Sequence, residues 1–343
     1  MLADIVALVL FLALATYTVT GGADFGGGVW DLLASGPRRD AQRDVISRAI
    51  GPIWEANHVW LILMIVVLFV ALPKAFGAIA TALHIPLVLM LIGVVLRGAA
   101  FVFRAYDPVD GASRRRWRRA FAIASTITPV FLGVVLGAIA GGALRMDAAT
   151  GRPTVGFFEA WLAPFPFLVG GLTLFLFAYL AAVYLTVEAD SEPLRDDFRR
   201  RALASGVGVG ALALATLLGA HAWAPRLASG LTAQWWSVPL HLVTAATAIA
   251  ALYALWRRRF RLARLAALAQ AVLVVLGLAG SLHPYVIAPD LTFERALAPA
   301  SVVVPMLVVL AAGAPLLVWA IALLYKVFKS QQAPGSPGPV DPD

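Results

Sequence analysis

The sequence predicts an all-α polytopic membrane protein with nine transmembrane helices. Three observations carry this prediction: 61% of the 343 residues are hydrophobic, only 13% are charged, and the mean hydropathy is +0.85. Water-soluble domains contain about 25% charged residues, so no soluble fold fits this composition. The chain has no cysteine, which excludes a disulfide framework, a thiolate metal site and covalent haem attachment.

Nine apolar segments are long enough to cross a bilayer, which takes about 20 helical residues. In chain order they cover residues 5–30, 53–72, 75–103, 120–144, 162–187, 202–224, 236–256, 262–283 and 301–325. The first segment lacks a basic leader and a cleavage site, so we expect it to be retained as a helix. Residues 1–328 are predicted to form one transmembrane domain. The Pro- and Gly-rich residues 329–343 are predicted to form a disordered cytoplasmic tail.

Basic residues indicate the orientation in the membrane. Of the 27 Lys and Arg, 21 fall in alternate loops and after the last segment, 5 fall in the opposite loops, and Arg97 lies within a segment. Because cytoplasmic loops are enriched in Lys and Arg, this predicts an external N-terminus and a cytoplasmic C-terminus. The same bias explains the net charge of +8, so we expect the lipid bilayer, and not nucleic acid, as a partner.

Two motifs place polar residues inside apolar segments. TGGADFGGGVW, residues 20–30, sets Asp24 among glycines, which favour close helix packing. The second motif, GPIWEANHVWLI at residues 51–62, contains Trp54, Glu55, Asn57, His58 and Trp60. Arg97 lies in the third segment, seven residues before Arg104 and on the same helix face. Charged side chains cost about 2.5 to 3.5 kcal/mol each to insert in a membrane, so they face a protein interior and indicate a functional site.

The helical rise of about 1.5 Å per residue brings the charged residues of the first three segments to one layer near the cytoplasmic boundary. Glu55 and His58 are i, i+3 neighbours, so a proton could pass between them directly or through one water. We predict a proton path formed by Asp24, Glu55 and His58. We expect a supporting polar and aromatic layer of Trp54, Asn57, Trp60, Arg97 and Arg104. The alternative is a packing contact in which Arg97 neutralises Asp24 or Glu55 and nothing titrates.

The other histidines, His84, His221, His241 and His283, lie one to a segment in the outer halves of the predicted helices. A multi-haem membrane cytochrome commonly places two histidines on each of two helices. We therefore expect these residues to be hydrogen-bonded core or interface side chains. No catalytic residue, haem or metal is predicted for this chain.

The two motifs resemble subunit II of the cytochrome bd-type ubiquinol oxidases. The resemblance continues in LRGAAFVFR at residues 96–104, YLTVEAD at 184–190 and HPYVIAPDLTFERALAP at 283–299, and it extends to about Phe328. It implies two four-helix bundles plus one peripheral helix in a bacterial cytoplasmic membrane, paired with a subunit I. In that family subunit I carries b-type haems, with or without haem d, and oxidises quinol. Glu55 stands at an acidic position that the family associates with proton delivery, and Asp24 matches the acidic residue of the glycine motif.

We therefore expect a haem-free subunit of a terminal quinol oxidase that supports subunit I and contributes to proton delivery from the cytoplasm. A small accessory membrane subunit is a further candidate partner. The alternative function is a secondary transporter with a buried charged site between helices 1, 2 and 3. Against it, Asp24 and Glu55 are expected near one boundary and not at the midplane. A structural scaffold without a proton role is the third interpretation.

Overall fold

The computed structural model describes residues 1–106, 112–147 and 151–331, without the side chains of residues 51–56, 104–106, 112, 114, 325 and 328–331. The described residues form twelve helices and one short hairpin. The elements are α1 (Leu2–Leu32), α2 (Arg39–Ala71), α3 (Pro73–Ala82), α4 (His84–Tyr106), α5 (Ala112–Ala140), α6 (Pro164–Glu188), α7 (Glu192–Trp223), α8 (Pro225–Thr232), α9 (Ser237–Trp256), α10 (Phe260–Leu282), β1 (Tyr285–Ile287), β2 (Leu291–Thr292), α11 (Phe293–Ala296) and α12 (Ala300–Gln331). Most of the predicted tail, residues 332–343, lies outside the described residues.

The long helices confirm the prediction of an all-helical polytopic membrane protein. Among the described residues, eight helices are long and apolar enough to cross a membrane, and a bent pair brings the number to nine if it counts as one span. The pair consists of residues Asn57–Ala71 of α2 and the whole of α3, which meet at 115°. Pro73 starts α3, whose buried residues Ala75, Ala78, Ile79 and Ala82 face the core. The predicted third segment, 75–103, is therefore two helices, α3 and α4, and not one.

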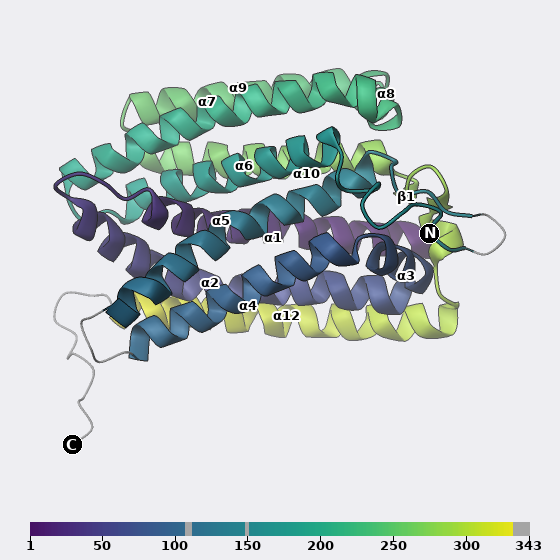
Figure 1. Cartoon of the computed structure of the whole chain (residues 1–343), viewed down its shortest axis with the longest axis horizontal. Helices are drawn as coiled ribbons and strands as arrows, with labels where there is room; N and C mark the ends of the chain where they lie inside the picture. Colours follow the sequence, from purple (N-terminus) through teal and green to yellow (C-terminus); the bar gives the residue numbers. More distant parts are fainter. Residues whose placement is uncertain (107–111, 148–150, 332–343) are drawn as a thin grey trace.

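The long helices run side by side along one axis (Figure 1). α1 lies at the centre, where it packs against α2, α5, α6 and α10. α4 packs on α5, whereas α7 packs on both α6 and α9, and α9 packs on α10. α12 contacts α2 along the lower edge of the molecule in Figure 1.

Helices α2, α5 and α7 extend beyond their predicted apolar segments into sequence that is rich in arginine. These polar turns lie at the end of the molecule away from the N-terminus (Figure 1). Ion pairs connect α2 with the start of α7: Arg38 with Asp197 at 2.6 Å, and Arg48 with Asp190. Such exposed pairs contribute about 0 to 1 kcal/mol each, so they align the helix ends more than they stabilise the fold.

Two glycines of the first motif permit the central position of α1. A Cβ atom on Gly26 would lie 2.0 Å from the carbonyl oxygen of Phe177 in α6, and one on Gly28 would lie 2.2 Å from Cβ of Ser125 in α5. Any larger residue would push these helices apart, because a backbone atom cannot move aside as a side-chain tip can. The glycine-rich sequence therefore sets how closely α5 and α6 approach α1.

Candidate functional site

A buried ion pair joins α1 to α4. The Arg97 guanidinium donates to both carboxylate oxygens of Asp24; Nη1 lies 2.7 Å from Oδ2, and Nη2 donates to Oδ1. The side chains are 0% exposed at Asp24 and 1% exposed at Arg97. A two-point contact of this kind fixes both the distance and the orientation of the two groups.

Neighbouring polar groups complete the hydrogen bonds of this pair. Asn57 of α2 donates to Asp24 Oδ2 at 3.2 Å, and Thr20 donates to Asn57 Oδ1 at 3.1 Å. Arg97 Nε donates to Ser125 Oγ of α5 at 2.9 Å. We refer to Thr20, Asp24, Asn57, Arg97 and Ser125 as the buried polar layer. It connects α1, α2, α4 and α5, and all of its members are buried except Thr20, which is half-buried and whose hydroxyl also lies 2.9 Å from the Thr16 carbonyl oxygen.

Aromatic rings enclose the cationic end of the layer. The guanidinium carbon of Arg97 lies 4.4 Å from the ring centre of Phe25 and 5.2 Å from that of Phe121. These faces attract the cation and also keep water away from it. A buried pair of this kind costs about 3 to 5 kcal/mol when one partner is removed, because the other charge is left uncompensated. The layer is therefore built to hold fixed charges in place.

The structure brings together three of the predicted site residues: Asp24, Asn57 and Arg97. Ser125 and Thr20 were not predicted as members of the site. Ser125 is one serine in a long apolar helix, and its contact with Arg97 depends on the packing of α5 against α4. No local sequence signal distinguishes it from other membrane serines.

His58 and Trp60 lie next to the buried polar layer in α2, and both are half-buried. Trp60 packs against an apolar cluster that contains Tyr17 and Phe25. The side chains of Trp54, Glu55 and Arg104 lie outside the described residues, although their backbones belong to α2 and α4. At 3.6 residues per turn, positions 55 and 58 share one face of α2, and that face differs from the face of Asn57.

The remaining histidines are hydrogen-bonded, but His221, His241 and His283 are exposed on this chain and do not belong to its core. The Nδ1 atoms of His84, His221 and His241 lie 2.7 to 3.0 Å from backbone carbonyl oxygens three or four residues earlier. His283 Nε2 lies 3.2 Å from Asp4 Oδ1. Among the described residues, no group of three or more His, Asp or Glu side chains is placed to hold a metal ion.

A second carboxylate–arginine contact lies outside the membrane-spanning helices, at the end that carries the N-terminus. Asp290, between β1 and β2, accepts from Arg145 Nε at 2.9 Å and from the Met146 backbone at 2.9 Å. Burial by itself would raise the pKa of Asp290, but the hydrogen bonds from Arg145 and Met146 hold that pKa below its usual value.

Comparisons with known proteins connect these features to one family. The family model for cytochrome bd terminal oxidase subunit II matches residues 2–328. Cytochrome bd-I ubiquinol oxidase subunit 2 from Escherichia coli is 27% identical over 186 residues, which are 54% of this chain and 48% of the relative. Cytochrome bd ubiquinol oxidase subunit 2 from Bacillus subtilis is 33% identical over 115 residues, or 33% of each chain. The chain thus aligns with about half the length of its Escherichia coli relative.

A solved structure has the same fold. The bd oxidase from Geobacillus thermodenitrificans contains a chain that superposes with a TM-score of 0.75 at 21% sequence identity, covering 96% of this chain and 99% of that one. The family match spans nearly the whole chain and includes both polar motifs. The chain therefore belongs to the family of cytochrome bd terminal oxidase subunit II.

Proposed function

We propose that this chain is the haem-free subunit of a membrane complex that oxidises quinol and reduces oxygen to water. The family match over residues 2–328 carries the proposal, because it includes both the glycine-rich motif and the motif around Glu55. The chemistry of quinol and oxygen takes place in a partner, subunit I, with b-type haems, with or without haem d. This chain supports that partner and helps to deliver protons to it.

The histidine positions support a haem-free role. His58, His84, His221 and His241 come from α2, α4, α7 and α9, and His283 follows α10. No spanning helix thus carries two histidines, whereas the helices of a multi-haem membrane cytochrome commonly do.

We further propose nine membrane spans, with the bent α2–α3 pair counted as one. α1, α2, α4 and α5 form one four-helix bundle, α6, α7, α9 and α10 form the other, and α12 is the peripheral helix. The end with the arginine-rich turns would face the cytoplasm of a bacterium, which leaves the N-terminus outside. Reporter fusions at Ser113 and Arg152 test this orientation: we expect cytoplasmic and external signals respectively, and the same side for both would contradict it.

The proton path that we propose runs along α2 near the buried polar layer. Glu55 and His58 would exchange the proton, since they occupy one face of the helix one turn apart. Asp24 contributes the fixed negative charge of the layer through its pair with Arg97. A transporter site would need carboxylate oxygens that are open to a substrate or ion, whereas both oxygens of Asp24 accept from Arg97.

Co-expression with its haem-bearing partner tests the proposed function. The purified complex should contain haem and consume oxygen when supplied with quinol, whereas this chain purified alone should contain no stoichiometric haem. If the isolated chain contained stoichiometric haem, and lost it on substitution of His84 or His241, the proposal that only the partner binds haem would be contradicted. Transport of a solute by the isolated chain in vesicles would favour the transporter instead.

A further inference from the structure

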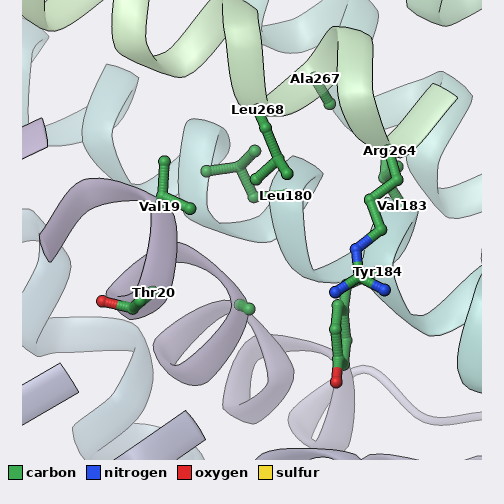
Figure 2. Close-up of a pocket in the computed structure, with 9 residues that line it drawn as sticks. Val19, Thr20, Leu180, Val183, Tyr184, Arg264, Ala267 and Leu268 are labelled. Carbon is green, nitrogen blue, oxygen red and sulfur yellow. The ribbon is translucent and has the colours of Figure 1, made fainter. Parts of the chain in front are cut away.

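A cleft between α1, α6 and α10 adjoins the buried polar layer at Thr20 and lies away from the face of α2 that carries Glu55. Its lining includes Val19 of α1, Leu180, Val183 and Tyr184 of α6, and Arg264 and Leu268 of α10, and its volume is about 100 Å³. Figure 2 shows Arg264 reaching from α10 over Tyr184, while Val19, Leu180 and Leu268 gather beside them. The cleft is therefore mostly apolar, with the Thr20 hydroxyl on its wall and one cationic end.

Tyr184 and Glu188 hold the guanidinium group of Arg264 in position, but Glu188 is too far away to accept a hydrogen bond from it. Its central carbon lies 4.4 Å from the ring centre of Tyr184. Nη1 lies 3.6 Å from Glu188 Oε1, which is within ion-pair range but too long for a hydrogen bond. The side chain is 36% exposed. Its N–H groups can therefore donate to a ligand at the rim of the cleft.

The size of the cleft restricts what it could hold. Pockets that enclose a complete small ligand measure about 300 to 1,000 Å³. At about 100 Å³, this cleft could enclose only one segment of a longer molecule. Val19 and Leu268 are half-buried, so the remainder of that molecule could continue along the outer surface of the helices. A flexible hydrocarbon chain meets these conditions, whereas a rigid ring system does not.

Positive charge gathers at the same end of α10. Arg257, Arg259 and Arg261 are exposed, while Arg258 pairs with Glu192 and Asp196 of α7. No carboxylate among the described residues forms an ion pair with Arg261. Arg261 and Arg264 are i, i+3 neighbours and share one face of α10. Arg261, which does not itself line the cleft, thus stands one turn from Arg264, which does.

Two exposed aromatic side chains place this region at the edge of the membrane. Tyr253 and Trp256, at the end of α9, are 56% and 61% exposed, and their ring centres lie 6.0 Å apart. Tyr and Trp are enriched at membrane–water interfaces, at the level of the lipid headgroups. Arg264 lies about 6 Å along α10 from its first residue, Phe260, which brings it to a similar depth.

We propose that the cleft binds one phospholipid with an anionic headgroup. The lipid phosphate would lie against Arg261 and Arg264, and part of one acyl chain would pack on Val19, Leu180 and Leu268. Basic pockets between spanning helices are suited to such headgroups because the bilayer supplies the ligand at high local concentration. The bound lipid would join α1 to α6 and α10 and so stabilise the contact between the two proposed bundles. This inference does not depend on the proton path.

The test measures the thermal midpoint of the delipidated complex with its partner as phosphatidylglycerol is added. Phosphatidylcholine and inorganic phosphate serve as probes of the acyl chain and of the anion alone. Arg264→Gln removes the cation, and Leu268→Trp fills the cleft while keeping every arginine. Arg200→Gln is the matched control, because Arg200 is exposed at the same end of the molecule and does not line the cleft.

We expect phosphatidylglycerol to raise the midpoint of the wild-type and Arg200→Gln complexes. Arg264→Gln should need about fivefold more of this lipid, the loss expected for one basic residue near an anionic headgroup. Leu268→Trp should abolish the rise in midpoint on addition of phosphatidylglycerol. If Arg264→Gln fails to assemble, this variant alone tests whether the lipid occupies the cleft. A wild-type response in Leu268→Trp would overturn the proposal. An equal shift with phosphatidylcholine would show a nonspecific lipid effect, and an equal shift with inorganic phosphate would show a simple anion site; either result overturns it.

Discussion

Replacing Asp24 by Asn leaves the Arg97 cation inside the protein without a counter-charge. Both side chains are almost completely buried, at 0% and 1% exposure. Removing one partner of such a pair costs about 3 to 5 kcal/mol, so Asp24→Asn and Arg97→Gln should each destabilise the complex by that amount. If the two effects were independent, the double variant would lose about 6 to 10 kcal/mol.

The double variant should instead lose only about 1 to 3 kcal/mol. It buries no charge, and the two amides can hydrogen-bond to each other, to Asn57 and to Ser125, so the remaining cost is about one imperfectly satisfied polar group. The measurement is unfolding in mixed detergent, followed by tryptophan fluorescence. Asp190→Asn is the control, because its pair with Arg48 is 71% and 54% exposed and should contribute at most about 1 kcal/mol. Additive losses in the double variant would refute a coupled ion pair.

Two further predictions concern packing and pH. Gly26→Ala should prevent assembly or lower stability by at least about 1 to 3 kcal/mol, because the new Cβ would meet the Phe177 carbonyl oxygen. A Cβ on Gly210 would have no atom within 4 Å, so Gly210→Ala should stabilise α7 by about 0.5 to 1 kcal/mol. Equal thermal midpoints for the two alanine variants would contradict the packing argument. Because the folded-state pKa of Asp290 lies below its unfolded value near 3.8, its contact with Arg145 should contribute stability fully above that pH and lose it as pH falls through the folded pKa. The midpoint difference between wild type and Asp290→Asn should therefore be present at pH 7 and shrink in acid below that value, and a difference that grows in acid would show the wrong sign.

The apolar segments predicted most of the long helices, because a spanning helix must be apolar along its length. They could not locate where α2 and α7 begin, since those turns are polar and are held by ion pairs between helix ends that lie far apart in sequence. Pro73 indicated a break. The 115° bend and the separation of α3 from α4, however, depend on where the apolar face of α3 finds a partner. Local sequence does not contain that information.

The candidate site, too, could be predicted from the sequence only in part. An aspartate and an arginine inside apolar segments must find partners, so their burial could be expected from sequence. That Arg97 pairs with Asp24 could not be expected in the same way, because Asp24 and Glu55 were both within its expected reach. The contact with Asp24 follows from the approach of α1 and α5, which Gly28 and Ser125 permit. Thr20 and Ser125 gain their roles only through that packing.

Turnover of the assembled complex with Glu55→Gln is the most direct test of proton delivery through this chain. The amide keeps the size and much of the hydrogen bonding of the carboxylate but cannot exchange a proton. Haem content and assembly should therefore be retained, while quinol-driven oxygen uptake falls. General acid–base steps typically contribute about 10² to 10⁴ in rate, and a parallel water path would reduce the loss to about tenfold. Wild-type oxygen uptake, together with normal proton uptake from the cytoplasmic side in liposomes, would contradict a proton path through Glu55.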